Sequence, residues 1–385
     1  MPFTVQQGCI KDQFVTEEEL IDRFTGQELW MWSKNNYGQL GNNTTIPASS
    51  PVQTISGGTN WRQVSLGAFH AGAIKTDGTL WMWGFGQFGR LGNNSTVYTI
   101  SSPVQTISGG NNWKQVDGGQ GHTAAIKTDG TLWLWGNGCS GRLGTNSTVA
   151  QSSPVQTISG GTNWKQVSAG YCNSAGIKTD GTLWVWGFNG NGRLGTNSTV
   201  AQSSPVQTIS GGTNWKQVSL GYSNGAAIKT DGTLWLWGCG GYGWLGNNTT
   251  ISVSSPVQTI SGGTNWKQVS GGAAHAAAIK TDGTLWLWGN GCSGRLGTNS
   301  TVAQSSPVQT ISGGTNWKQV NSSFYNSAAI KTDGTLWLWG SGLCGRLGNN
   351  TEIFASSPVQ TISRGTNWKS VSIGYHTAAT RITEF

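Results

Sequence analysis

The chain has 385 residues, of which 60 are glycine and only 10% are charged, and this composition excludes a mainly helical protein. No apolar run approaches the roughly 18 residues that a membrane-spanning helix needs, so we expect no membrane insertion. The formal net charge is +8, yet residues 1–29 hold only two basic side chains against six acidic ones. An acidic leader therefore precedes a basic body, which either meets an acidic partner or is simply a solvated surface.

Residues 1–28 form this acidic leader. Within it, Thr16 is followed three residues later by Glu19, which is the signature of a capping box at the start of a helix. We expect a short helix over residues 16–24, acting either as a docking element or as a plug against the rest of the protein. The leader lacks the basic and apolar regions of a secretory signal. The protein is therefore expected to be cytoplasmic, or to be assembled inside a cell and released by lysis, as virus particles are.

From residue 29 onward the sequence repeats one unit of about 51 residues, a period typical of propellers and solenoids. Each unit carries a pentad with two tryptophans, Leu-Trp-x-Trp-Gly, whose last residue is Ser33 in the first unit. The pentads begin at Leu29, Leu80, Leu132, Leu183, Leu234, Leu285 and Leu336. Pro-Val-Gln-Thr and Asn-Trp each occur seven times at the same spacing, so the repetition extends through the whole unit.

Each unit is predicted to contain four short strands. In one representative unit, residues 164–168 alternate large apolar and polar side chains at the period of a strand. Residues 175–186 contain two further strand-like runs joined by Asp180-Gly181, a strong hairpin signal because both residues tolerate positive φ. Pro205 opens a fourth strand, at a position where the missing N–H is tolerated. Four strands in a unit of this length are typical of a propeller blade.

The two ends of the repeated region predict a closed ring. The first unit begins at Leu29 and lacks the two strands that precede the pentad elsewhere, whereas the last unit ends with those two strands alone. We therefore expect residues 368–385 to pair with residues 29–55, which removes both exposed sheet edges. The predicted fold is an all-β, closed seven-bladed β-propeller with four strands per blade, formed by residues 29–385.

One well-preserved run extends from Gly272 to Gly297 and has the sequence Gly-x-x-His-x-Ala-Ala-Ile-Lys-Thr-Asp-Gly-Thr-Leu-Trp-Leu-Trp-Gly-x-x-x-x-Gly-Arg-Leu-Gly. This pattern covers about residues 29–385 and resembles the repeats of the regulator of chromosome condensation family. The resemblance implies a seven-bladed propeller, in agreement with the count of repeats. The best-known member of the family is a nucleotide exchange factor for a small nuclear GTPase and also binds nucleosomes. An intracellular regulator that binds a GTPase or nucleic acid is therefore one alternative function.

The near-identity of the units, together with the leader sequence Lys-Asp-Gln-Phe-Val-Thr at residues 11–16, is similar to repeat proteins encoded by marine bacteriophages. This resemblance implies a structural protein of a virion, synthesised in the host cytoplasm. We predict a non-catalytic propeller in a tail, fibre or capsid-associated position. It would dock through its leader and bind a neighbouring subunit or a host receptor through its blade loops. A carbohydrate-binding propeller, with tryptophans stacked on sugar rings, is a further alternative.

The units differ from one another mainly in two loop registers, where aromatic, Asn, Ser and Gly residues vary within a constant frame. Such residues suit a binding surface, because Tyr and Phe supply contact area at low entropic cost, although neutral drift at solvent-facing loops would also produce variation. Register one follows the first strand, and its candidates are Phe69, His70, His122, Tyr171, Asn173, Tyr222, Asn224, His275, Tyr325, Asn326, Tyr375 and His376. Register two follows the pentad, and its candidates are Tyr37, Phe88, Arg90, Arg142, Arg193, Tyr242, Trp244, Arg295 and Arg346.

The histidines and arginines of these registers have structural alternatives. All four histidines lie at one position of register one, and Asn takes that position in the three remaining blades. Because both residues can donate a hydrogen bond, we expect a structural bond to a loop carbonyl rather than a ring of metal ligands. The five arginines of register two could hold carboxylates, phosphates or the sulfates of an acidic glycan, or could bond carbonyls in their own blades.

No pattern in the sequence indicates catalysis. We find no nucleophile–base pair, no paired carboxylates and no spacing of metal ligands, and the six cysteines form no Cys-x-x-Cys pair. We therefore predict no enzymatic activity, no cofactor and no metal. A protein is the expected partner, an acidic glycan is the second choice, and nucleic acid is not expected.

Overall fold

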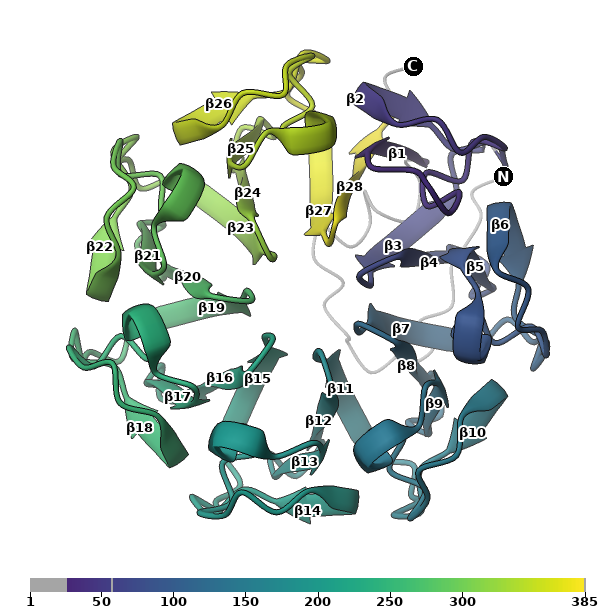
Figure 1. The fold of residues 1–385 in the computed structure, drawn as a ribbon, viewed down its shortest axis with the longest axis horizontal. Helices are drawn as coiled ribbons and strands as arrows, with labels where there is room; N and C mark the ends of the chain where they lie inside the picture. The colour runs from purple at the N-terminus through teal and green to yellow at the C-terminus, as the bar shows by residue number, and fades with distance from the viewer. Residues whose placement is uncertain (1–25, 57, 384–385) are drawn as a thin grey trace, which may run out of the picture.

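The computed structural model describes residues 26–56 and 58–383, so the helix predicted at 16–24 lies outside the described residues. Seven four-stranded antiparallel sheets surround a common axis (Figure 1). The closed seven-bladed propeller expected from the sequence is therefore confirmed. Among the described residues, no helix is long and apolar enough to cross a membrane.

Each blade contains an inner, a second, a third and an outer strand. The inner strands, nearest the axis in Figure 1, are β3 (Trp61–Leu66), β7 (Trp113–Gly118), β11 (Trp164–Ala169), β15 (Trp215–Leu220), β19 (Trp266–Gly271), β23 (Trp317–Ser322) and β27 (Trp368–Ile373). The second strands are β4 (His70–Lys75), β8 (His122–Lys127), β12 (Asn173–Lys178), β16 (Asn224–Lys229), β20 (His275–Lys280), β24 (Asn326–Lys331) and β28 (His376–Ile382).

The third strands carry the tryptophan pentads. They are β5 (Leu80–Phe85), β9 (Leu132–Gly136), β13 (Leu183–Gly187), β17 (Leu234–Gly238), β21 (Leu285–Gly289), β25 (Leu336–Gly340) and β1 (Gln27–Ser33). The outer strands are β6 (Thr99–Gln105), β10 (Gln151–Gln156), β14 (Gln202–Gln207), β18 (Val253–Gln258), β22 (Gln304–Gln309), β26 (Ala355–Gln360) and β2 (Ala48–Gln53). We number the blades from β3, so that blade 1 contains β3–β6 and blade 7 contains β27, β28, β1 and β2.

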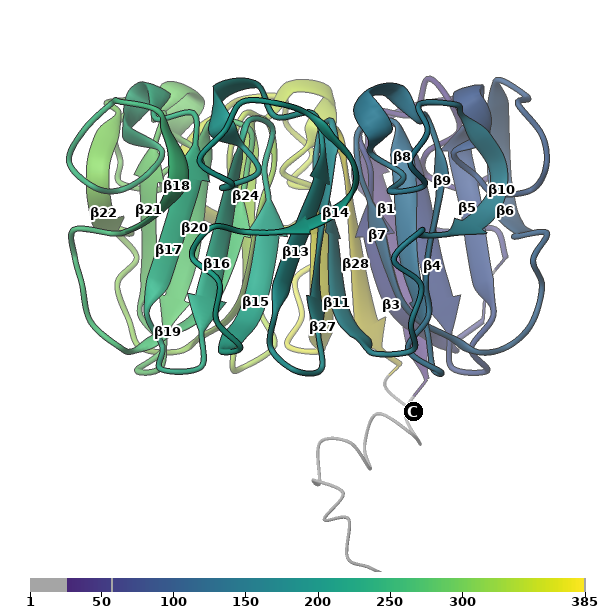
Figure 2. The same ribbon diagram turned by 90° about the horizontal axis from the view of Figure 1, so that it is seen from below.

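The two ends of the propeller differ, and we name them the loop face and the turn face. The loop face carries the connections from inner to second strands and the short 3-10 turns after the third strands, which Figure 2 shows along one edge. These turns are η1 (Gln87–Gly89), η2 (Cys139–Gly141), η3 (Gly190–Gly192), η4 (Gly241–Gly243), η5 (Cys292–Gly294) and η6 (Leu343–Gly345). The turn face carries the Asp-Gly hairpins that join second to third strands.

The Asp-Gly hairpins form because their residues satisfy one another. Gly78 has a φ of 81°, which a β-carbon would oppose, and the side chain of Asp77 accepts hydrogen bonds from the N–H and the hydroxyl of Thr79 at 2.9 and 2.7 Å. The indole of Trp81 then donates to the Thr79 hydroxyl at 2.9 Å. The same relay occurs in each blade that has an Asp-Gly hairpin, so the turn fixes the first tryptophan of the pentad.

The apolar core lies between neighbouring blades and forms seven clusters of buried side chains. In one of them, Leu80 and Leu91 of blade 1 pack against Trp113 and Trp135 of blade 2. The indole N–H of Trp135 donates to the carbonyl of Arg90 in blade 1 at 2.9 Å, so the buried polar atom is satisfied across the interface. Burial of two large aromatic side chains at each interface provides the main favourable term for ring formation.

Glutamine side chains link the inner strands of neighbouring blades. The amide of Gln115 in blade 2 donates to the carbonyl of Val167 in blade 3 at 2.9 Å and accepts from the Val167 N–H at 3.1 Å. Equivalent pairs join the other interfaces from blade 1 through blade 7. At the interface from blade 7 to blade 1, Ser370 takes this position, and its hydroxyl lies 2.7 Å from Thr380 in its own blade.

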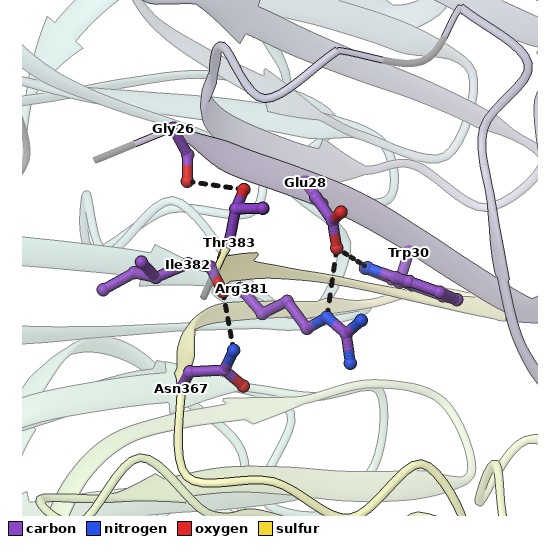
Figure 3. A network of polar contacts seen from close by, with 7 residues as sticks. All are labelled: Gly26, Glu28, Trp30, Asn367, Arg381, Ile382 and Thr383. Carbon is purple, nitrogen blue, oxygen red and sulfur yellow. Dashed lines mark hydrogen bonds and ion pairs between the residues drawn. The ribbon is translucent and has the colours of Figure 1, made fainter. Parts of the chain in front are cut away.

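Blade 7 closes the ring by combining both ends of the described chain. Strand β1 pairs with β28 from Gln27 opposite Ile382 to Ser33 opposite His376. Figure 3 shows the polar contacts at this seam, where the carboxylate of Glu28 pairs with the guanidinium of Arg381. Hydrogen bonding along seven residue pairs leaves neither β1 nor β28 as a sheet edge.

Candidate functional site: an aromatic patch on the loop face

Buried arginines position the loops of register one. The Nε of Arg90 donates to the carbonyl of Gln87 in its own blade, and its Nη1 donates to the carbonyl of Gln120 in the next blade, both at 3.0 Å. Arg142, Arg193 and Arg295 make the same pair of bonds, and their Nη1 atoms reach the carbonyls of Tyr171, Tyr222 and Phe324. In these four arginines the expected bond to a carbonyl of the same blade is therefore present. A second bond links each of them to a carbonyl of the next blade.

These arginines are enclosed by the protein rather than displayed as a ring for anions. Arg90, Arg142, Arg193, Arg295 and Arg346 are each no more than 7% exposed. Burial lowers the pKa of Arg90 to about 10, which still leaves the guanidinium charged at neutral pH. Its charge is stabilised by two carbonyl dipoles and by the ring of Phe85, 4.6 Å away. An acidic glycan would reach these groups only if the loops moved aside.

The remaining positions of register two have other roles. Arg346 donates to the hydroxyl of Ser341 at 3.3 Å. Trp244 is buried, and its carbonyl accepts the indole N–H of Trp288 at 2.7 Å. Phe88 and Tyr242 are exposed at the tips of η1 and η4, and among the described residues no ring contact joins either of them to the aromatic side chains near the axis.

The histidine register is buried inside the blades. His70 Nε2 lies 2.9 Å from the hydroxyl of Thr123 in the next blade, and that hydroxyl donates its only proton to the carbonyl of Arg90. His70 must therefore donate from Nε2, so its neutral tautomer follows from the hydrogen-bond network. The expected loop carbonyl is thus wrong as the partner, because a hydroxyl of the neighbouring blade takes that place.

Burial also removes the His and Asn residues of register one from the set of surface candidates. His70, His122, Asn173, Asn224, His275, Asn326 and His376 are all buried. Desolvation lowers the pKa of each histidine, to about 3 for His376. No group of His, Cys, Asp or Glu in the described part of the chain is arranged to hold a metal ion. We therefore exclude all seven residues from the contact surface, and His70, His122 and His275 link neighbouring blades through hydroxyl groups.

The other aromatic candidates of both registers meet around the axis and, together with Phe324, form what we call the aromatic patch. Its members are Tyr37, Phe69, Tyr171, Tyr222, Phe324, Tyr325 and Tyr375. The ring of Tyr375 stacks on Phe324 with centroids 4.6 Å apart and on Phe69 with centroids 4.9 Å apart. Tyr222 contacts Phe324 at 5.8 Å and Tyr171 at 3.8 Å. The patch thus joins residues from five of the seven blades.

Sequence reasoning did not select Phe324 as a site residue, although it is the ring that joins the two halves of the patch. The signal was present, since Phe324 precedes Tyr325 and aligns with Tyr171, Tyr222 and Tyr375 of the other repeats. The carbonyl of Phe324 is held by Arg295 at 2.8 Å, so its loop is fixed in the same way as those of Tyr171 and Tyr222.

A ring of glycines allows the loops to approach closely enough for the aromatic rings to touch. The N–H of Ala68 donates to the carbonyl of Gly119 in the next blade at 3.2 Å, and similar bonds continue around part of the axis. A β-carbon on Gly221 would lie 2.2 Å from the carbonyl oxygen of Gly272, so a side chain there would force the blades apart. Beneath the patch these residues line a cavity of about 90 Å³.

A larger hollow lies at the edge of the patch, between blades 6, 7 and 1. It has a volume of about 400 Å³ and is lined by Lys34, Phe69, Tyr325, Leu343, Arg346 and Tyr375. The guanidinium of Arg346 lies 4.8 Å from the ring centre of Tyr325, and the ammonium of Lys34 lies 6.0 Å from that of Phe69. The hollow therefore combines apolar walls with two positive charges.

The hydroxyls of Tyr171 and Tyr375 stay protonated at neutral pH. A hydrogen bond with Tyr222 raises the pKa of Tyr171 to about 12. Burial, together with neighbouring Tyr325, raises the pKa of Tyr375 to about 12. Tyr171 and Tyr375 therefore present uncharged hydroxyls that can both donate and accept hydrogen bonds.

Comparison with known proteins places this geometry in a family. The Regulator of chromosome condensation (RCC1) repeat matches residues 28–74, 77–126, 129–177, 180–228, 231–279 and 282–330. The chain is similar to the ultraviolet-B receptor UVR8 of Arabidopsis thaliana, with 29% identity over 343 residues that cover 87% of this chain and 77% of that protein.

Two solved structures have the same fold. Prp20p from Saccharomyces cerevisiae has a TM-score of 0.83 and 15% identity, with 98% of this chain and 97% of that chain covered. Human WBSCR16 has a TM-score of 0.80 and 18% identity, with 94% and 100% covered. The resemblance to bacteriophage proteins stays a prediction. Six matched repeats and the shared propeller show that this chain belongs to the regulator of chromosome condensation (RCC1) repeat family.

Proposed function

We propose that this protein is a non-catalytic binding propeller that holds a protein partner on its loop face through the aromatic patch. The observation that carries the proposal is the continuous contact of seven partly exposed aromatic rings, supplied by five blades, around the axis. Tyr and Phe side chains at the centre of an interface supply much of the binding energy when a partner excludes water from them.

The supporting structure makes this surface ready to bind. The loops of Tyr171, Tyr222 and Phe324 are fixed by arginines of the preceding blades. A surface that is already ordered loses less conformational entropy on association, so more of the contact energy contributes to affinity. A partner that approaches along the axis would meet the rings of Tyr222 and Tyr325, which are 37% and 38% exposed.

The hollow beside the patch favours a partner that presents an acidic side chain. Lys34 and Arg346 supply its two positive charges, and Phe69 and Tyr325 form its apolar walls. The Nε of Arg346 is buried and has no hydrogen-bond acceptor among the described residues. A carboxylate that enters the hollow would neutralise positive charge near Lys34 in a partly desolvated site, and it would reach the Nε of Arg346 only if the surrounding loop moved aside.

The relatives agree with a binding role. UVR8 is named as a receptor, and the structure of Prp20p is described together with its binding to Gsp1p and histones. A small GTPase is therefore a reasonable first candidate to test for this chain. A stimulated release of guanine nucleotide would favour the regulator predicted as an alternative, whereas binding without release would favour an adaptor.

The experiment is a titration with a purified partner. The tagged protein is used to isolate a partner from its source, and the purified partner is titrated calorimetrically against wild type, Tyr222→Ala and Tyr325→Ala. We expect affinity to fall about tenfold or more in each variant, because each removes a ring from the centre of the interface. Tyr242→Ala and Phe88→Ala are matched controls, since both remove exposed rings of the same face outside the patch. Equal losses in controls and patch variants would contradict the proposal.

The setting of the protein is a separate question. A place on a virus particle, reached through the leader, rests on the bacteriophage resemblance and stays a prediction. Mass spectrometry of purified particles tests it directly. Presence in a fixed ratio to the capsid subunits would support a virion protein, and presence only in the cytoplasm would favour an intracellular binding protein.

A further inference from the structure

We propose that the turn face carries a docking site for an acidic polypeptide segment, and that its occupant is the acidic stretch from Asp12 to Asp22 of the same chain. The site lies on the face opposite the aromatic patch, so the inference does not depend on the proposed function. Its basis is a ring of basic residues around the axis and the position at which the acidic stretch joins the propeller.

The second residue of every inner strand is basic, and together these residues form what we call the inner basic ring. Its members are Arg62, Lys114, Lys165, Lys216, Lys267, Lys318 and Lys369. The first six are exposed and the last is half-buried. Since one residue comes from each blade, the sevenfold arrangement of the inner strands in Figure 1 places all seven around the axis.

A β-bulge sets the direction of these side chains. Trp113 is opposite Lys127 and Gln115 is opposite Ile126, so Lys114 is an extra residue with no opposite residue on β8. The same irregularity occurs at the start of each inner strand. Arg62 shows where such a side chain points, because its Nη2 donates to the carbonyls of Trp113 and Lys114 in the next blade at 2.7 and 3.2 Å. The Arg62 side chain therefore reaches along the inner edge from blade 1 to blade 2.

Hydrogen bonding places this ring on the turn face. The N–H of Trp113 donates to the carbonyl of Gly78 in the Asp-Gly hairpin of blade 1 at 3.0 Å. Trp164, Trp215, Trp266, Trp317 and Trp368 make the same bond to the hairpins that precede them. Each inner strand thus begins beside a hairpin of the turn face, and the basic residue follows immediately.

A second set of cations on the same face is held rigidly and adds to the positive field. These residues end the second strands, and they are Lys75, Lys127, Lys178, Lys229, Lys280, Lys331 and Arg381. Each lies between two indole rings, as Lys229 does at 4.9 Å from Trp215 and 4.7 Å from Trp235. Stacking on both sides fixes these cations in place.

The carboxylates of the turn face do not balance these charges. Six hairpin aspartates stand against fourteen basic residues, and each accepts hydrogen bonds from the threonine of its own turn, as Asp77 does from Thr79. One further carboxylate, that of Glu28, pairs with Arg381. The turn face therefore has a net positive charge concentrated around the axis, which attracts an anionic polymer.

The chain itself brings carboxylates to this point. Gln27 forms a bridge with Asn60, and Asn60 lies two residues before Arg62 of the inner basic ring. The hydroxyl of Thr383 donates to the carbonyl of Gly26 at 3.2 Å and holds the junction on the turn face (Figure 3). Residues 1–25 therefore join the propeller directly beside the ring that we assign as their docking site.

The composition and reach of residues 1–25 fit the site. They contain Asp12, Glu17, Glu18, Glu19 and Asp22. Asp22 precedes Gly26 by four residues and Asp12 precedes it by fourteen, so an extended chain would reach about 13 to 46 Å from the junction. Attachment to the same chain gives the acidic stretch an effective concentration in the millimolar range, so individually weak ion pairs suffice for high occupancy. Salt would weaken the contact, because exposed charges are screened.

Zero-length cross-linking of the full chain tests the assignment. A carbodiimide joins carboxylates to lysine amines in contact, and the tryptic peptides are unambiguous because the residues after each inner-ring lysine differ between blades. We expect links from Glu17, Glu18, Glu19 or Asp22 to the lysines of the inner basic ring. An equal mixture of ¹⁵N-labelled and unlabelled protein identifies the donor chain. Links within one isotope only support the proposal, whereas mixed links assign the stretch to a second copy and contradict it.

A second measurement follows the acetylation rates of individual lysines. In a variant with Glu17→Gln, Glu18→Gln, Glu19→Gln and Asp22→Asn, inner-ring lysines should react about fivefold faster than in wild type if the site is about 80% occupied. Glu352→Gln is the matched control, since it removes an exposed carboxylate on a loop away from the turn face, and it should change no rate. Tyr325→Ala should also leave these rates unchanged, which separates this test from that of the aromatic patch. Unchanged inner-ring rates in the neutralised leader variant would overturn the proposal.

Discussion

The carboxylate of Glu28 lies 3.2 Å from the Nε of Arg381 and accepts the indole N–H of Trp30 at 3.0 Å, so one side chain joins the first strand of the ring to the last. In the other blades a threonine of the Asp-Gly hairpin accepts the equivalent indole proton, as Thr79 does from Trp81. Blade 7 has no such hairpin, because the two ends of the described chain meet there. The pair formed by Glu28 and Arg381 takes over the task of the missing turn.

Substitution of Glu28 should weaken this seam. Glu28→Gln removes the ion pair and keeps an acceptor for Trp30, and both charged side chains are partly accessible to water. We expect the free energy of unfolding to fall by about 1 kcal/mol at low salt and by less in 1 M salt, where the ion pair is screened. Urea denaturation at the two salt concentrations measures the difference. Glu352→Gln, an exposed carboxylate away from the seam, should show no such change.

The glutamine linkage predicts opposite effects at two equivalent positions. Gln217→Ala removes one bond to the carbonyl of Val269 and one from its N–H, at 3.1 and 3.0 Å, and should lower the free energy of unfolding by about 2 kcal/mol. Ser370→Gln should raise it, because it supplies this linkage to the interface from blade 7 to blade 1, where it is absent. Thermal melting of both variants provides the comparison. If Ser370→Gln lowers the melting temperature, the seventh interface has a different geometry from the rest.

Asp117 should make the protein less stable as the pH rises. Its carboxylate accepts bonds from the Ala169 N–H and the Ser65 hydroxyl at 2.8 Å each, yet desolvation raises its pKa to about 6 from the usual 3.8. The folded state therefore binds the proton more tightly, and the stability from this group is full below pH 4 and is lost as the pH rises through 6.

Asp117→Asn removes this dependence and keeps an acceptor, as Asn321 already provides for the N–H of Ile373 at 3.0 Å. We expect the variant to be more stable than wild type by about 1–2 kcal/mol at pH 8 and equal to it at pH 4. Denaturation curves at both pH values decide the matter. A gain of the same size at pH 4 would show that the carboxylate charge is not the cause.

His275 should give the opposite pH dependence. Desolvation holds its pKa well below 6.5, so the folded state requires the neutral ring and stability is lost as the pH falls below 6.5. Asn already takes this position in blade 6, as Asn326. In His275→Asn the loss in the free energy of unfolding should be smaller by about 1.4 kcal/mol for each pH unit below 6.5. Unfolding measured between pH 7 and pH 5 gives the two slopes. Parallel slopes would place the acid sensitivity elsewhere.

The fold could be predicted from the sequence because the same pattern occurs seven times. The Asp-Gly pairs predicted hairpins, and the two missing strands before Leu29 predicted the closure that β1 and β28 form. Each of these signals is local or concerns the order of strands, and neither depends on how side chains pack between blades.

The site was harder to predict because variation between repeats does not separate exposed from buried positions. His122 and Tyr171 both lie in register one, yet the former is buried between blades and the latter belongs to the aromatic patch. The inner basic ring could not be predicted because its residues are basic in every repeat. Lys165 and its equivalents follow an invariant tryptophan, so comparison of the repeats does not distinguish them from the constant frame. Burial and the direction of a side chain at a bulge come from packing in three dimensions, which a repeat pattern does not contain.

Pairing of β1 with β28 has a consequence for biosynthesis. The hairpin of β1 and β2 leaves the ribosome before the other described strands, whereas β27 and β28, which complete its sheet, follow all of them. Blades 1 to 6 can each form as soon as their own four strands have emerged, but the nascent hairpin must wait with an open edge until β27 and β28 have emerged. A chain that ended between Gln360 and Trp368 would therefore be an open arc of six blades with an unpaired hairpin at one end.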